Sequence, residues 1–175
     1  SDTVRVDGNI IYLESGKPLV YMPLAVELNL TNSPYIKTAG ARMAKYEVDR
    51  NAFNDGKSPD NDIVLFRYAD VLLMKAEAAV RNGENGNTEL NLVRNRSGMG
   101  NRTATLDNIL AERLMELMWE GWRRNDLIRF NRFHQSYDLR TAPETEADRH
   151  TIVFPIPSRA LDLNEKLKQN KGYQR

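Results

Sequence analysis

Residues 62–78 read DIVLFRYADVLLMKAEA, and the stretch has the spacing of an amphipathic helix. From Tyr68 onward, apolar and long side chains recur at intervals of three and four residues. They are Tyr68, Val71, Leu72, Lys75, Ala76 and Ala79. Asn82 and Gly83 follow, a pair typical of a helix C-terminus. The pattern predicts a helix that begins near Phe66 and stops at Asn82-Gly83, with this set of residues on its packing face.

A second, weaker helix is predicted from Thr88 to Ser97, where Gly98 and Gly100 end it. A loop rich in Gly and Asn joins the two helices, so together they form an αα-hairpin of about the length of a tetratricopeptide (TPR) unit. A single unit of this kind cannot bury its own apolar face. We therefore expect the hairpin to pack on the rest of the chain or on a segment outside it.

A third helix is predicted to begin at Thr105, whose hydroxyl can cap the first turn, with Asp107 complementing the helix dipole. Gly121 marks its end or a kink. A shorter helix is predicted from about Arg124 to Phe133. The third helix should bury Leu106, Ile109, Leu110, Leu114, Leu117 and Met118, and the shorter one Leu127, Ile128 and Phe130.

The C-terminal part is predicted to be mostly irregular. Thr141 to Arg149 is polar and reads as a loop. Thr151 to Pro157 should be extended, because each proline disfavours helical geometry in the residue before it. Ser158 to Leu163 can form one helical turn, and Asn164 to Arg175 should lie along the surface.

Residues 1–60 differ from the rest, because glycine and proline interrupt every candidate helix. Three short apolar runs suit strands, at Ile10–Leu13, Leu19–Met22 and Ala25–Leu28. The predicted fold is mainly α, with a TPR-like αα-hairpin, further helices, irregular loops and a few short strands. We expect one domain made of an irregular loop and short-strand segment (1–60) and a helical region (61–175).

Composition narrows the range of functions. Lys and Arg number 25 against 24 Asp and Glu, so a net charge of +1 gives no basic field to attract nucleic acid. No run of about 18 apolar residues is present that could span a bilayer. With no cysteine and two histidines, thiolate metal sites and cysteine nucleophiles are excluded within these residues. We expect neither a metal nor a cofactor.

Three carboxylates, Glu112, Glu116 and Glu120, recur every four residues on one helix face. Hydrolysis of a glycosidic bond requires two carboxyl groups about 5 to 10 Å apart. The enzymatic alternative is therefore a glycosidase that acts through Glu116 and Glu120. Nearby arginines favour a structural ion-pair network instead. The expected partners of that network are Arg123, Arg124, Asp126 and Arg129. We expect no enzymatic activity.

The aromatic residues offer candidate ligand contacts. Trp119 and Trp122 could stack on sugars, although tryptophans so close together at a helix end are more often core or interface anchors. Tyrosines on loops suit neutral polar ligands, because the ring covers the apolar face of a sugar while the hydroxyl bonds its rim. Residues 1–60 hold Tyr12, Tyr21, Tyr35, Tyr46 and Phe53.

Four separated blocks together resemble the SusD/RagB family. Residues 62–78 resemble its LFRYADVLLMxAEA helix, and Leu92–Gly98 its VRxRAG segment. Glu112–Arg129 resembles ERxxELxWEGxRxxDLIR, and Phe154–Tyr173 resembles PIPxxEIDLNPNLxQNPGY. The blocks stand in the family's order. Departures are modest, with Trp122 where the family often has His and Lys171 where Pro is usual.

The resemblance covers only the C-terminal part of the family, so we expect the chain to be a fragment of a longer protein. Family members carry a signal peptide, a lipobox cysteine and several earlier helical pairs ahead of this part. The resemblance thus implies the C-terminal part of the SusD-like fold, and membrane attachment only through an N-terminal lipid anchor that these residues do not contain.

The function that the resemblance implies is binding without turnover. Members are surface-exposed outer-membrane lipoproteins of Bacteroidetes-type bacteria that serve nutrient uptake. They capture oligosaccharide or polysaccharide and pass it to a SusC-like TonB-dependent transporter. Sugar contacts in the family come from variable loops, partly ahead of the Phe66–Tyr68 stretch, which selects Tyr12, Tyr21 and Tyr35 as ligand-binding candidates. The alternatives are a SusD-like binder of another nutrient such as peptides, and a helical scaffold that binds a protein partner without a small ligand.

Overall fold

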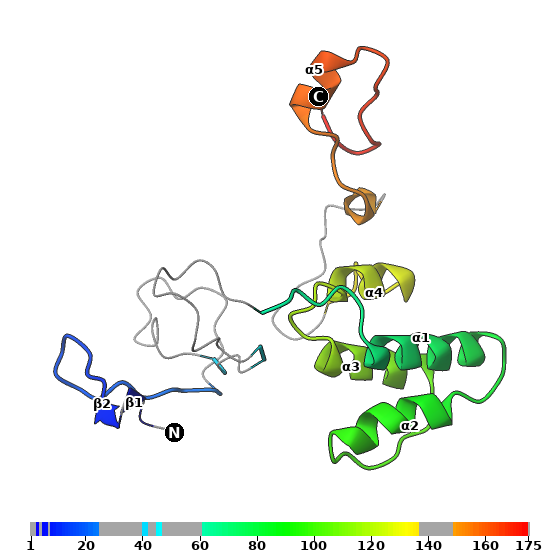
Figure 1. Ribbon diagram of the computed structural model, residues 1–175. Coiled ribbons are helices and arrows are strands. Elements are labelled where there is room, and N and C mark those ends of the chain that lie inside the picture. Colours follow the sequence, from blue (N-terminus) through cyan, green and yellow to red (C-terminus); the bar gives the residue numbers. More distant parts are fainter. Residues whose placement is uncertain are drawn as a thin grey trace. The chain divides into compact units, whose positions relative to one another are not determined.

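The computed structural model describes residues 3, 5, 6, 8–24, 40, 41, 45, 46, 61–136 and 149–174. The chain divides into two compact units, Ser1–Asn61 and Asp62–Arg175. Within the described residues there are five α-helices, one 3₁₀ helix and a single sheet of two strands (Figure 1). The fold is mainly α, as the sequence predicts.

The first unit contains a small antiparallel hairpin. Strand β1 (Arg5–Val6) pairs with β2 (Asn9–Ile10), with Arg5 opposite Ile10 and Val6 opposite Asn9. Isolated bridges join Thr3 to Val20 and Tyr12 to Pro18. Of the predicted strands Ile10–Leu13 and Leu19–Met22, only Ile10 lies in a strand. Backbone hydrogen bonds from Leu13 to Lys17 and from Leu19 to Ile11 continue the pairing without forming a further strand among the described residues. Ala25–Leu28 lies outside the described residues.

The second unit begins with the predicted helical hairpin. Helix α1 spans Tyr68–Arg81 and α2 spans Asn87–Arg96, within one residue of the predicted second helix. Gly86, in the connection, is buried against α1. A Cβ at this position would lie 2.5 Å from the backbone oxygen of Ala76. Glycine is therefore needed for the chain to approach α1 this closely.

The hydrophobic core of this unit lies between three helices. Helix α3 (Leu106–Glu116) contacts both α1 and α2 (Figure 1). The fully buried apolar side chains of this core are Leu73, Ala76, Leu90, Val93 and Ile109. These side chains come from α1, α2 and α3, so one face of the hairpin packs on the rest of the chain, as expected.

The predicted packing face of α1 is partly wrong. Tyr68 is 73% exposed and Val71 48% exposed, and Lys75 faces solvent. The side chains that α1 buries are Asp70, Leu73, Ala76 and Glu77. Two of these four are carboxylates, which arginines from other helices neutralise in the interior. The buried side of α1 therefore includes two carboxylates, which an apolar pattern alone does not mark.

The next two helices are shorter than predicted. The hydroxyl of Thr105 accepts a hydrogen bond from the Asn108 amide at 3.1 Å, which confirms the predicted cap of α3. Helix α3 ends at Glu116 instead of near Gly121. A turn follows, and α4 runs over Arg123–Arg129 instead of Arg124–Phe133. Of the predicted inward residues of these two helices, Ile109, Leu110, Leu117 and Leu127 are buried.

The C-terminal segment holds a 3₁₀ helix, η1 (His150–Ile152), and α5 (Ser158–Leu163), which has the predicted bounds. Thr151 and Ile152 are thus helical, whereas they were expected to be extended. The tail after α5 bonds back to the preceding stretch. The Gln169 amide pairs with the backbone N–H and C=O of Ile156 at 2.8 and 2.9 Å, and the Tyr173 hydroxyl donates to the Val153 carbonyl at 2.8 Å.

No helix in the described ranges combines the length and apolarity needed to cross a membrane. Residues 141–148 of the predicted polar loop lie outside the described residues.

Candidate functional site

The three regularly spaced carboxylates are all engaged by arginines. Glu112 pairs with Arg94 at 2.5 Å in the interior. Glu116 and Glu120 both bind Arg67, at 2.5 and 2.8 Å, and Glu116 also binds Arg96 at 2.7 Å. The ion-pair interpretation is confirmed, but the cations come from α2 and from the residue before α1 and not from the expected arginines. A carboxylate held in this way is poorly placed to exchange protons with a substrate.

Arg67 connects the start of α1 to the end of α3. Burial lowers the pKa of Arg67, but hydrogen bonds and charge interactions with Glu116 and Glu120 outweigh that effect, so the pKa lies above its ordinary value. Its guanidinium also donates to the backbone oxygen of Glu116. The group is permanently charged and serves as a fixed cross-link.

A second buried ionic cluster contains two of the expected network residues, Asp126 and Arg129, together with Asp70 and Glu77, which the sequence analysis did not single out. Arg113 of α3 donates to Asp70 of α1 at 2.7 Å and to Asp126 of α4 at 2.9 Å, and all three side chains are at most 2% exposed. Glu77 of α1 binds Arg129 of α4 and Arg81. Asp70 and Glu77 are seven residues apart, the spacing of one helix face, and this was the signal that could have revealed them.

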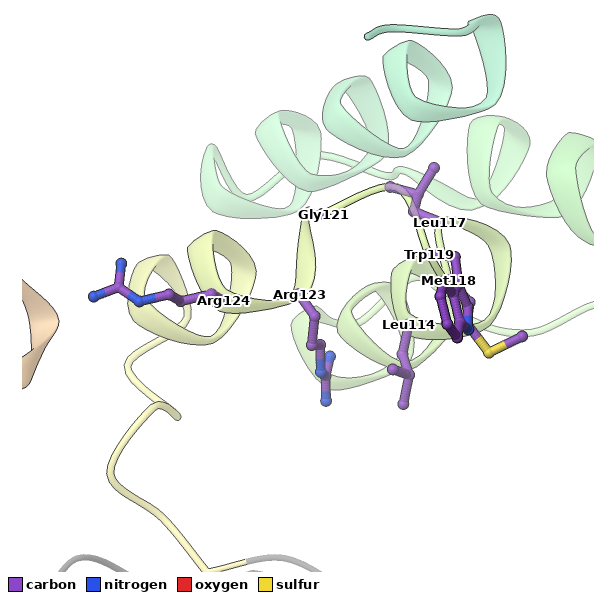
Figure 2. Close-up of a pocket in the computed structure, with 7 residues that line it drawn as sticks. All are labelled: Leu114, Leu117, Met118, Trp119, Gly121, Arg123 and Arg124. Atoms are coloured by element: carbon purple, nitrogen blue, oxygen red, sulfur yellow. The ribbon is translucent and has the colours of Figure 1, made fainter. Parts of the chain in front are cut away.

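The two tryptophans have different surroundings. Trp122 is half-buried and packs on Phe66, with ring centroids 5.4 Å apart. Trp119 is 72% exposed and borders a depression of about 350 Å³ between α3 and α4 (Figure 2). The lining residues are Leu114, Leu117, Met118, Trp119, Gly121, Arg123 and Arg124. Trp122 is therefore a packing residue, whereas Trp119 is accessible to a ligand or partner.

Two of the three candidate tyrosines lie among the described residues, both in the first unit. Tyr12 is 60% exposed beside β2, opposite Pro18. Tyr21 is half-buried and follows Val20, which is bridged to Thr3. Tyr35 lies outside the described residues. The accessible ring of Tyr12 is compatible with stacking on a ligand, and the assignment of all three as ligand contacts stays a prediction.

The outer side of the hairpin is open. A groove of about 430 Å³ is lined by Arg67, Tyr68, Ala69, Leu72, Leu92, Val93 and Arg96. A more polar depression of about 350 Å³ is lined by Asn87, Thr88, Asn91, Leu92, Asn95 and Asn101. The groove between α1 and α2 carries an exposed Tyr68 and Leu92. An apolar side of the hairpin thus remains unpaired within the described residues.

The described part of the chain contains no group of three or more His, Asp or Glu placed to hold a metal ion. Exposed aromatic side chains among the described residues include Tyr12 in the first unit and Tyr68, Trp119 and Phe154 in the second.

Comparison with known proteins identifies a matching family and similar sequences. The family model described as "SusD family" matches residues 27–173. The starch-binding protein SusD of Bacteroides thetaiotaomicron is 31% identical over 150 residues, which are 78% of this chain and 27% of that protein. The SusD-like protein P38 of Formosa agariphila is 34% identical over 130 residues, covering 65% of this chain and 25% of that one.

A solved structure is also similar. Surface glycan-binding protein A from Bacteroides thetaiotaomicron, determined in complex with laminarihexaose, superimposes with a TM-score of 0.57 at 32% identity. The match covers 65% of this chain and 26% of that one. The chain therefore spans about a quarter of the length of each of these relatives.

Proposed function

This chain belongs to the SusD family, and from that membership we propose that it is part of a cell-surface component that captures glycans for an outer-membrane nutrient importer. The observation that carries the proposal is the family match over residues 27–173. It is supported by relatives that are themselves named for binding starch or surface glycan, one of them solved with laminarihexaose. The bound oligosaccharide or polysaccharide would be passed to a SusC-like TonB-dependent transporter.

We assign ligand contact to Tyr12, Tyr21 and Tyr35. The support is chemical: a tyrosine on a loop offers an apolar ring to the sugar face and a hydroxyl to its rim. Tyr12 meets the first condition, since its ring is largely accessible.

The protein binds its ligand without cleaving it. The relatives named above are binding proteins. Here the carboxylate pair that could act on a glycosidic bond, Glu116 and Glu120, shares the guanidinium of Arg67. Hydrolysis of a glycosidic bond needs two carboxyls that can reach the substrate, and here both carboxylates are bound to arginine.

We place the protein at the outer-membrane surface, held there by an N-terminal lipid anchor outside these residues. The support is family membership. Fractionation of the native host with the lipid-modified and unmodified protein would test this placement. An unmodified protein that stays with the outer membrane would contradict the anchor.

The ligand proposal is tested by calorimetry on the complete gene product that contains this chain. Its binding is measured against an oligosaccharide panel that includes laminarihexaose and maltohexaose. We expect saturable binding to at least one glycan, and a loss of about tenfold or more, roughly 1.4 kcal/mol, when Tyr12, Tyr21 and Tyr35 are changed together to alanine. Tyr68→Ala is the control, because Tyr68 is an exposed tyrosine outside the first unit, on α1.

Several outcomes would contradict the proposal. Unchanged affinity in the triple variant would remove the tyrosine assignment. Binding of peptides and no glycan would favour another nutrient. Release of reducing ends above the level of the Glu116→Gln variant would show catalysis.

The open groove between α1 and α2 favours a second candidate, a helical scaffold that binds a protein partner without a small ligand. Purification of the tagged complete gene product from native membranes separates the two. Recovery of a TonB-dependent transporter together with glycan binding supports the importer. Recovery of another protein, with no glycan binding, supports the scaffold.

A further inference from the structure

Three asparagines recur along one face of α2 at intervals of four residues. They are Asn87, Asn91 and Asn95, and this interval places them one above the other on the helix surface. Asparagine is a poor helix former, because its short amide competes for the hydrogen bonds of the backbone. A row of three in a helix of ten residues is therefore not explained by helix formation.

Two members of the row hold the chain that returns after α2. Asn91 pairs with both backbone polar groups of Arg102, accepting from its N–H at 2.8 Å and donating to its C=O at 3.0 Å. Asn87 accepts a hydrogen bond from the N–H of Ala104 at 2.5 Å. The loop that directly follows Asn101 is thereby fixed against the helix.

The third member, Asn95, has no such role. The loop advances by two residues for each step of the row, so the next loop residue in register is Gly100. Arg94 occupies the carbonyl of Gly100 instead, at 2.8 Å. Within the described residues, the side chains of Asn95 and Asn101 make no hydrogen bond, and both are exposed. Two amides on a fixed frame are thus available to a ligand.

Both amides line the more polar depression described above, of about 350 Å³. The other two depressions described above are each lined by two arginines, whereas this one has no charged side chain in its lining. Leu92, which is 53% exposed, adds an apolar surface between the amides. The depression therefore offers neutral polar groups beside one apolar side chain.

A neutral sugar ring matches this lining. A carboxamide presents an acceptor oxygen and a donor nitrogen side by side, so it can bond to two neighbouring hydroxyls of one ring. The hydroxyl of Thr88 can donate or accept, and Leu92 can meet the C–H face of the ring. An anion would find no cation here, and an apolar ligand would leave the amides without partners.

We propose that this depression, centred on Asn95 and Asn101, is a subsite for a neutral sugar ring of the glycan. The proposal rests on the proposed function, and it is separate from the tyrosine assignment, which concerns the first unit. Asn87 and Asn91 are positioning residues of the subsite, because they fix the loop that carries Asn101.

The first test compares two double variants of the complete gene product by calorimetry, on the oligosaccharide panel that includes laminarihexaose and maltohexaose. Asn95→Ala with Asn101→Ala removes both amides and leaves the helix intact, since alanine is the better helix former. Asn82→Ala with Asn125→Ala is the matched control, because these two asparagines are exposed and lie outside the depression. We expect the first pair to weaken binding of at least one glycan about fivefold or more, and the control pair to change it by less than about twofold.

The second test measures whether the glycan covers the depression. Residues 1–175 contain no cysteine, so Asn101→Cys introduces a single thiol into this region. Asn82→Cys is the control. Maleimide labelling of each position is followed by mass spectrometry, with and without a saturating concentration of a glycan that the parent binds. We expect the glycan to slow labelling at position 101 about threefold or more and to leave labelling at position 82 unchanged.

The outcomes separate this subsite from the proposed function. If the parent binds a glycan, but either the affinity of Asn95→Ala with Asn101→Ala or the labelling rate at position 101 is unchanged, the subsite is overturned and the proposed function stands. If the parent binds no glycan of the panel, both are overturned. Slower labelling with a peptide and not with a glycan would assign the depression to a peptide and would also overturn the proposal.

Discussion

Replacement of Arg113 by methionine tests a deeply buried ionic cluster of the protein's helical unit. Arg113 bridges Asp70 and Asp126, at 2.7 and 2.9 Å, and thereby joins α1, α3 and α4. Its side chain is 2% exposed, and those of its partners are 1 and 2% exposed. Methionine fills a similar volume without charge. The variant therefore removes the cation and leaves the shape of the cluster largely intact.

The expected loss follows from which partners remain. Asp126 keeps a second cation, because Arg129 lies 2.8 Å from its other oxygen. Asp70 has no second cation among the described residues, and its Oδ2 atom is already buried without a hydrogen-bond partner. An uncompensated buried carboxylate costs about 3–5 kcal/mol of folding free energy. We expect Arg113→Met to lower the free energy of unfolding by that amount, most of it through Asp70.

Urea unfolding followed by far-ultraviolet circular dichroism measures this loss in the complete gene product. Arg132→Met is the matched control. Arg132 forms an ion pair of the same length, 2.8 Å, with Asp107, but the two side chains are 43 and 76% exposed. Pairs of that kind contribute about 0.2–1 kcal/mol and weaken in high salt. The effect of Arg113→Met should persist in high salt.

A further substitution identifies the source of the loss. Asp70→Asn added to Arg113→Met removes the unpaired charge and should restore about 1–3 kcal/mol. Two results would refute this reasoning. One is that Arg113→Met lowers the free energy of unfolding no more than Arg132→Met does. The other is that Asp70→Asn restores none of the lost stability, since the buried charge would then not be the source of the loss.

Three smaller effects complete the predictions. Gly86→Ala should lower the free energy of unfolding by about 1–3 kcal/mol, because its Cβ would overlap the α1 backbone. Gly100→Ala, with open space around it, should be neutral or slightly stabilising, and chemical denaturation of both variants measures the difference. Thr105→Ala should cost about 1 kcal/mol through loss of the α3 cap, whereas Thr105→Ser should retain most of it in the same assay. A hydrogen bond from Lys75 holds the pKa of Glu89 below its ordinary value, so their pairing stabilises the fold above the pKa of an unfolded glutamate. That stabilisation is lost as the pH falls through the lower pKa of Glu89 in the folded state. Lys75→Met should therefore be destabilising at neutral pH and have no effect in acid, and an equal loss of stability at both pH values would contradict the assignment.

Helix positions were predictable because their signals are local. The cap at Thr105, the stop at Asn82-Gly83 and the single turn from Ser158 to Leu163 each depend on a few adjacent residues. The ends of α3 and α4 were less predictable. The apolar pattern continues to Met118, but the helix stops at Glu116 because the chain turns there to bring Glu120 to Arg67.

The assignment of Tyr12, Tyr21 and Tyr35 as ligand contacts rests on residue type, loop placement and the family resemblance, and it stays a prediction. The difference between the two tryptophans was not visible in the sequence, because it depends on whether a neighbour such as Phe66 reaches the ring. Accessibility is a property of packing, so two tryptophans three positions apart can differ in it.

The sequence alone established family membership, the mainly helical fold and the approximate bounds of most helices in the helical unit, since these follow from motifs and hydrogen bonds between near neighbours. Folding into three dimensions set which face of α1 is buried and which arginine neutralises each acid. Arg113 binds Asp70, which is 43 residues away in the sequence, and Arg67 binds Glu120, which is 53 residues away. A carboxylate is buried only where a cation from another element meets it, and local periodicity carries no record of that distant partner.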